Sequence, residues 1–92
     1  MNNRMIAQRL LEVAHSLEEK HANLYRVKAY RQAAQTVLGL DQPVEEIVAS
    51  AGRRALKDLP GIGVKLSAKI ETLVRTGDIA TLKEGDARLT AV

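Results

Sequence analysis

The segment Leu-Pro-Gly-Ile-Gly-Val-Lys at residues 59–65 constrains the fold more than any other part of the chain. Pro60 has no amide hydrogen and Gly61 readily adopts a positive φ, so a helix is expected to end here. Gly63 can begin the next helix, because the apolar residues that follow it repeat with helical spacing. The segment therefore predicts two helices joined by a tight hairpin, over about residues 53–76.

Further helices are predicted where apolar residues recur three or four positions apart. They cover about residues 3–20, 25–38 and 43–50, with a turn or two over 53–58 and a last full helix over 63–75. No segment alternates apolar and polar residues as a half-buried strand does. We therefore expect an all-α fold, a small bundle of four to five short helices. The inner side of the second helix is expected to hold Val27, Tyr30, Ala34, Val37 and Leu38.

The length of 92 residues indicates one domain, which we place at residues 1–84. A final turn containing Ile79 and Leu82 is expected to pack on the bundle, and residues 85–92 to form a flexible tail. The chain has no cysteine and no run of 18 apolar residues. We expect a cytoplasmic protein without a membrane segment, associated with the nucleoid if the cell is bacterial.

The basic residues are unevenly distributed along the chain. Residues 26–31 and 53–75 together carry a charge of +7, whereas the remaining residues carry −4. Both basic segments lie on or beside the predicted hairpin. A basic face of this kind is typical of a protein that binds a polyanion such as DNA.

The hairpin itself can bind a phosphate through its main chain. The first four N–H groups of a helix have no partner within the helix, and the helix dipole favours an anion there. Gly61, Gly63 and Val64 would present such amides without bulky side chains over the glycines, and Lys65 would add a positive charge.

Three motifs in a fixed order resemble one protein family. They are Tyr-Arg-Gln-Ala-Ala at residues 30–34, Leu-Pro-Gly-Ile-Gly at 59–63 and Lys-Ile-Glu at 69–71. They resemble the N-terminal helix-hairpin-helix domain of family X DNA polymerases, the DNA polymerase beta type, over about residues 3–84. The resemblance implies DNA binding without sequence specificity, at gaps, nicks or 5′-phosphate ends during DNA repair. It does not extend to a polymerase domain, so polymerase activity is not expected from this chain alone.

The resemblance also implies site residues. Tyr30, Lys57 and Lys65 match the family's 5′-phosphate pocket, and Arg26 stands where the family has a lysine. No cofactor is required, but the family's hairpin carbonyls hold a monovalent cation that bridges to a phosphate. The matching carbonyls, which would bind Na⁺ or K⁺, belong to Lys57, Leu59 and Ile62.

Lys69 is the candidate catalytic residue. With Lys65 at 0° on the helical wheel, the apolar arc spans about 80° to 180° and Lys69 falls at about 40°. Partial burial and neighbouring bases favour the neutral amine, which can form a Schiff base with an aldehyde. In the resembling family the matching lysine removes a 5′-deoxyribose phosphate by β-elimination. The alternative is a lysine that only contacts phosphate.

Three hypotheses remain at the level of the sequence. The favoured one is a DNA-binding module that works with another repair protein or a polymerase chain. The second is a 5′-deoxyribose-phosphate or abasic-site lyase with Lys69 as nucleophile. Three residues depart from the family pattern and weaken it: Ala68, Asp58, and Tyr25 at a position near the pocket that is often His or Phe. The third is a helical module for protein interaction, in which the hairpin is only structural.

Overall fold

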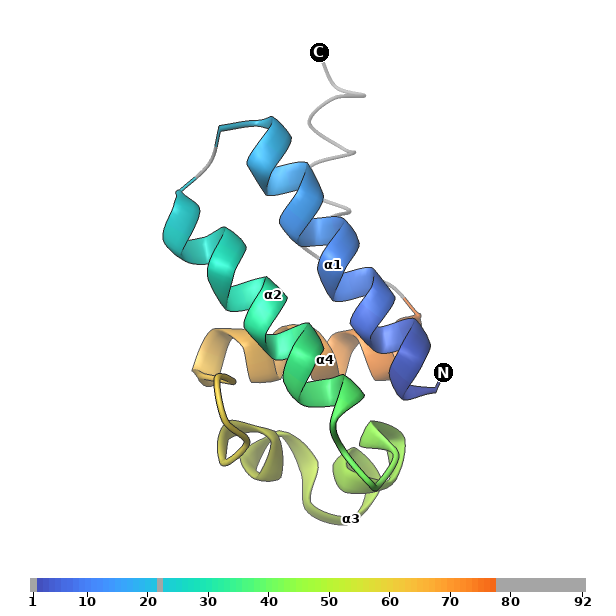
Figure 1. Ribbon diagram of the computed structural model, residues 1–92. Coiled ribbons are helices and arrows are strands. Elements are labelled where there is room, and N and C mark those ends of the chain that lie inside the picture. The colour runs from blue at the N-terminus through green and yellow to red at the C-terminus, as the bar shows by residue number, and fades with distance from the viewer. Residues whose placement is uncertain (1, 22, 78–92) are drawn as a thin grey trace.

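The computed structural model describes residues 2–21 and 23–77, and these form four helices and no strand. Helices α1 (Asn3–Glu19) and α2 (Leu24–Leu38) lie antiparallel, α4 (Val64–Thr76) crosses behind them, and α3 (Val44–Lys57) lies at their lower end (Figure 1). The predicted all-α bundle is confirmed. The predicted turn with Ile79 and Leu82 and the predicted tail over 85–92 lie outside the described residues.

The helix boundaries follow from capping residues. The Asn2 side chain accepts a hydrogen bond from the amide of Met5 at 2.8 Å, and that of Asn23 accepts one from Tyr25 at 2.8 Å. Gly39 ends α2, and Gly77 ends α4 in a left-handed conformation. These are the short-range signals that N-caps and C-caps provide, so α1, α2 and α4 begin and end within two residues of the predicted positions.

Helix α3 is bent and consists of two helical segments. Gly52 has φ 67° and ψ −162°, which interrupts the helix between Val44 and Lys57. This break matches the two short helices predicted from the sequence. The first segment has no cap of its own, because its N-cap residue is Pro43. Instead, the side chain of Asn3 accepts from the amide of Val44 at 2.8 Å and donates to the carbonyl of Gln42 at 3.0 Å. The start of α1 is thereby attached to the start of α3.

The core is shared by all four helices, because Val44, Ile47 and Leu56 of α3 join the buried residues of α1, α2 and α4. It is built from aliphatic residues and one tyrosine, since the chain has no Phe or Trp. Leu38 was expected in this core, but it is 53 % exposed at the end of α2. The adjacent Val37 is fully buried, and because successive residues of a helix point about 100° apart, only one of the two faces the core. The largest fully buried aliphatic side chains are Ile6, Leu10, Val27, Val37, Val44, Leu56, Ile70 and Leu73.

Candidate nucleic-acid interface

The turn between α3 and α4 is held by two main-chain hydrogen bonds and one buried side chain. The amide of Leu59 donates to Leu56 at 3.1 Å, and the amide of Ile62 donates to Leu59 at 3.1 Å. The side chain of Ile62 is only 3 % exposed and joins the core. Gly61 has φ 76°, in the left-handed region that favours glycine. The turn is therefore fixed to the protein by Ile62, with Gly61 before it and Gly63 after it exposed.

The same turn is held against α2. The hydroxyl of Thr36 donates to the carbonyl of Pro60 at 2.7 Å. A Cβ atom on Gly61 would lie 2.7 Å from Cγ of Gln32, so the main chain passes directly over that side chain. These two contacts fix the position of the hairpin relative to α2.

The hairpin leaves several amides without a partner. Gly63 caps α4 with no side-chain hydrogen bond, and the first bond of that helix runs from the amide of Ser67 to Gly63 at 2.9 Å. Among the described residues, no acceptor bonds the amides of Gly61, Gly63, Val64 or Lys65. All four residues are exposed. An anion is the ligand that such a set of donors favours.

Ser67 does not take part in this surface. Ser67 has a polar side chain at the start of α4, and yet it is fully buried. Its hydroxyl donates to the carbonyl of Val64 at 2.7 Å. A serine can enter a helical core in this way, because the main chain of the preceding turn satisfies its hydroxyl.

A groove of about 580 Å³ separates α2 from the hairpin. Lys28 and Gln32 line it from α2, and Lys57 lines it from the end of α3. Tyr25, which is 80 % exposed, belongs to the same lining. None of the residues that line this groove is acidic. The full lining is Tyr25, Lys28, Ala29, Gln32, Lys57, Leu59, Gly61, Ile62 and Gly63.

The residues predicted from the sequence fall into two groups. Those that line the groove are Lys57, Leu59, Gly61, Ile62 and Gly63. Those that do not line it are Arg26, Tyr30, Val64, Lys65 and Lys69. In this second group, Arg26, Val64 and Lys65 are exposed, and Lys69 is partly buried, as its position beside the apolar arc predicts.

Tyr30 lies in the core and is 4 % exposed. Its hydroxyl makes no hydrogen bond among the described residues, and no buried side-chain polar atom there lacks a partner. The hydroxyl therefore stays in contact with solvent while the ring packs inside. The packing role of Tyr30 is evident, and its role in a phosphate pocket stays a prediction.

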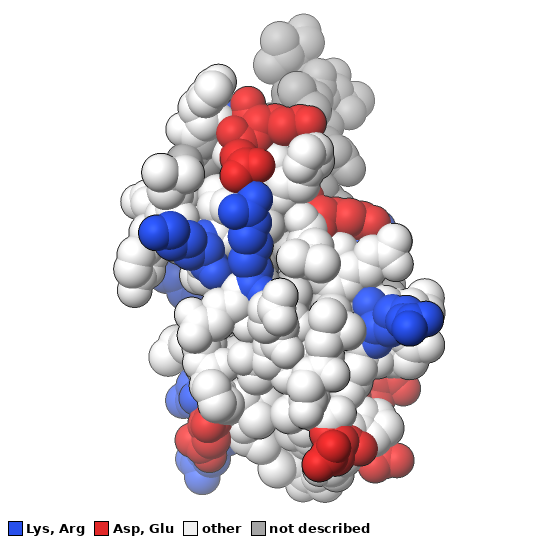
Figure 2. Space-filling model, in the orientation of Figure 1, with Lys and Arg blue, Asp and Glu red and all other residues white. Residues whose placement is uncertain are grey.

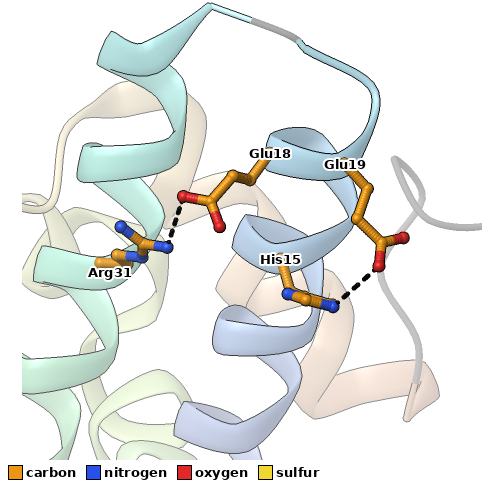
Figure 3. Close-up of polar contacts among 4 residues, drawn as sticks. All are labelled: His15, Glu18, Glu19 and Arg31. Atoms are coloured by element: carbon orange, nitrogen blue, oxygen red, sulfur yellow. Dashed lines mark hydrogen bonds and ion pairs between the residues drawn. The ribbon is translucent and has the colours of Figure 1, made fainter.

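The basic face is smaller than the charge count of the segments suggests. Arg31 donates to Glu18 of α1 at 2.8 Å, while His15 lies 2.9 Å from Glu19 on the far side of that helix (Figure 3). Arg75 pairs with Glu71 at 3.5 Å. Among the described residues, no carboxylate pairs with Arg26, Lys28, Lys57, Lys65 or Lys69.

Figure 2 shows where the bases lie on one face of the molecule. Blue side chains gather over α2 and, lower on the same edge, near the second half of α3. A smaller blue group lies at the opposite edge. Red side chains lie at the upper and lower ends of this face, on the upper part of the opposite edge, and between the lower blue side chains of the first edge. The edge that carries α2 and the hairpin is thus richer in bases than the rest of the view.

The carbonyls expected to bind Na⁺ or K⁺ differ in their hydrogen bonds. The carbonyl of Leu59 accepts a hydrogen bond from the amide of Ile62, whereas no amide among the described residues donates one to the carbonyl of Lys57 or of Ile62. The cation site stays a prediction. Within residues 2–21 and 23–77, no three acidic or histidine side chains group as a side-chain metal site would require.

On the α2 side of the groove, only the position of Tyr25 was expected near the phosphate pocket, and Lys28, Gln32 and Thr36 were not predicted as part of the site. Tyr25, Lys28, Gln32 and Thr36 are spaced by three, four and four positions, which places them on one stripe of α2. This stripe faces the hairpin. The sequence did contain a signal for this surface: a helix stripe without aliphatic residues, next to a face that packs in the core, indicates a surface exposed to solvent.

Comparison with known proteins agrees with this geometry. The family model for the helix-hairpin-helix domain matches residues 1–79. No curated protein shows significant similarity to the chain. In the part of the chain that the structure describes, no helix combines the length and the apolar character needed to cross a bilayer.

Proposed function

The chain belongs to the helix-hairpin-helix domain family, and on this basis we propose that it binds the DNA backbone through the turn between α3 and α4. Domains of this family generally bind DNA without sequence specificity. One observation supports the proposal most: hairpin amides that lack an acceptor among the described residues border a groove with two lysines and no acid. Phosphate contacts of this kind position a protein on DNA without reading its bases.

The proposal includes a preference for gaps, nicks or 5′-phosphate ends in DNA repair. The resemblance to the N-terminal domain of family X DNA polymerases supports this preference. So does Tyr25, because an exposed ring beside a basic groove can stack on an unpaired base. In this role the chain would act in the cytoplasm beside another repair protein or a polymerase chain.

The salt dependence of binding tests the proposal. About four basic contacts, from Arg26, Lys57, Lys65 and Lys69, predict a slope of log K against log salt near −3 to −4. Fluorescence anisotropy with labelled gapped and intact duplexes, from 50 to 300 mM NaCl as a rough range, measures it. The gapped duplex is expected to bind more tightly. Binding that does not respond to salt would contradict a backbone contact.

A second candidate function is a 5′-deoxyribose-phosphate or abasic-site lyase. The observation that favours it is the environment of Lys69, which is partly buried and has no carboxylate partner among the described residues. Its amine would condense with the aldehyde of the opened sugar and release water. The Schiff base would then assist loss of a proton from C2′ and cleavage of the C3′–O bond.

Borohydride trapping on abasic DNA tests the lyase. The native protein is expected to give a covalent adduct, because reduction fixes the Schiff base. Lys69→Ala should lose the adduct, while its DNA binding weakens only by the roughly eightfold expected for one lost contact at 0.1 M salt. Lys65→Ala loses a contact of the same kind and should keep the adduct. If the native protein forms no adduct, the lyase is rejected and DNA binding is judged separately by the salt titration.

A further inference from the structure

Lys28 is a base on the exposed surface of α2 that lines the groove opposite the end of α3. Lys57, the last residue of α3, lines the same groove. Neither has a carboxylate partner among the described residues. Two ammonium groups that line one groove can both attract an anion that lies between them.

The remaining polar groups of the groove also suit an anion. The carboxamide of Gln32 lies against Gly61, and the amides of Gly61 and Gly63 have no acceptor among the described residues. The lining thus combines cationic, carboxamide and main-chain donors, and no carboxylate competes for them. Phosphate oxygens accept from every one of these donor types.

We propose that Lys28 and Lys57 together bind a second backbone phosphate, next to the phosphate held by the amides at the start of α4. A DNA strand would then pass from the hairpin along α2 toward Tyr25. This inference rests on the proposed DNA binding and adds to it a second contact from α2, beside Arg26, and a direction for the strand. It also assigns to Lys28 a role that neither the hairpin nor the resemblance implies.

The test is a salt titration of Lys28→Gln against the native protein. One lost contact should reduce the magnitude of the slope by about 0.7 on a single strand and about 0.9 on a duplex. At 0.1 M salt this corresponds to a loss of affinity of about five- to eightfold. Running a short labelled single strand beside a gapped duplex shows which of the two supplies the phosphate.

Two further variants serve as controls. Lys28→Arg keeps the charge and is expected to keep the slope. Arg4→Gln removes an exposed base at the start of α1. The start of α1 lies near the C-terminal end of α4, whereas the hairpin lies at the N-terminal end of α4 (Figure 1), so this variant should leave the slope unchanged. If Lys28→Gln behaves like Arg4→Gln while the native protein binds DNA, this inference is overturned and the proposed function stands. If the native protein does not bind DNA at all, both are overturned.

Discussion

Reversing the charges of Lys57 and Lys65 together should weaken DNA binding on the order of 100-fold at 0.1 M salt. Both side chains are exposed beside the hairpin. Each lost phosphate contact lowers affinity about eightfold at this salt concentration, and the introduced carboxylates repel the backbone as well. Anisotropy with a labelled gapped duplex measures the loss, and thermal unfolding checks that the double variant remains folded.

A matched double variant separates the effect of the hairpin site on affinity from the effect of net charge. Arg4→Glu with Arg75→Glu changes the net charge by the same amount. Both residues lie away from the hairpin, Arg4 at the start of α1 and Arg75 at the end of α4. We expect this variant to lose only a few-fold, through weaker long-range attraction. Equal losses in the two double variants would show that binding follows overall charge and would argue against the hairpin as the site.

Gly61→Ala should lower the free energy of unfolding by about 1–3 kcal/mol. At φ 76° the new Cβ is strained, and it would also lie 2.7 Å from Cγ of Gln32. For a domain of this size such a change lowers the melting temperature by roughly 4–8 °C for each kcal/mol. Circular dichroism during heating measures it. A melting temperature equal to that of the native protein would contradict the left-handed conformation at Gly61.

Gly63→Ala and Gln32→Ala make this result interpretable. Gly63 has φ −96°, which any residue adopts, and a Cβ there meets nothing within 4 Å. The free energy of unfolding of Gly63→Ala should therefore stay within about 0.5 kcal/mol of the native value. The added methyl group should hinder the approach of a phosphate to the amides and so weaken DNA binding. Adding Gln32→Ala to Gly61→Ala removes the steric contact, so the cost that remains belongs to the backbone conformation.

Local signals account for what could be predicted of the fold. Asn2, Asn23, Gly39 and Gly77 act within a turn of their own position, so helix ends could be placed from the sequence. Gly52 likewise marked a break inside α3. The sequence of the hairpin predicted exposed glycines, an uncapped helix start and a positive φ at Gly61. The observed φ values add that, of the two hairpin glycines, Gly61 alone requires the absence of a Cβ.

Contacts between helices account for what could not be predicted. Glu18 and Arg31 are 13 residues apart, and only the packing of α1 on α2 brings them together and removes one base from the basic face. The groove depends on how α2 is rotated relative to the hairpin, which Thr36 and Gln32 fix. Ser67 is a partial exception: at about 200° on the helical wheel it borders the apolar arc, so its burial could have been expected.

The chain contains two tyrosines and no tryptophan, and the two rings lie in different environments. Tyr30 is enclosed in the core, whereas Tyr25 stands exposed at the groove. Tyrosine emission can therefore follow binding without any added dye. A ligand that stacks at the groove is expected to quench Tyr25 directly, whereas Tyr30 loses its enclosed environment only when the bundle unfolds.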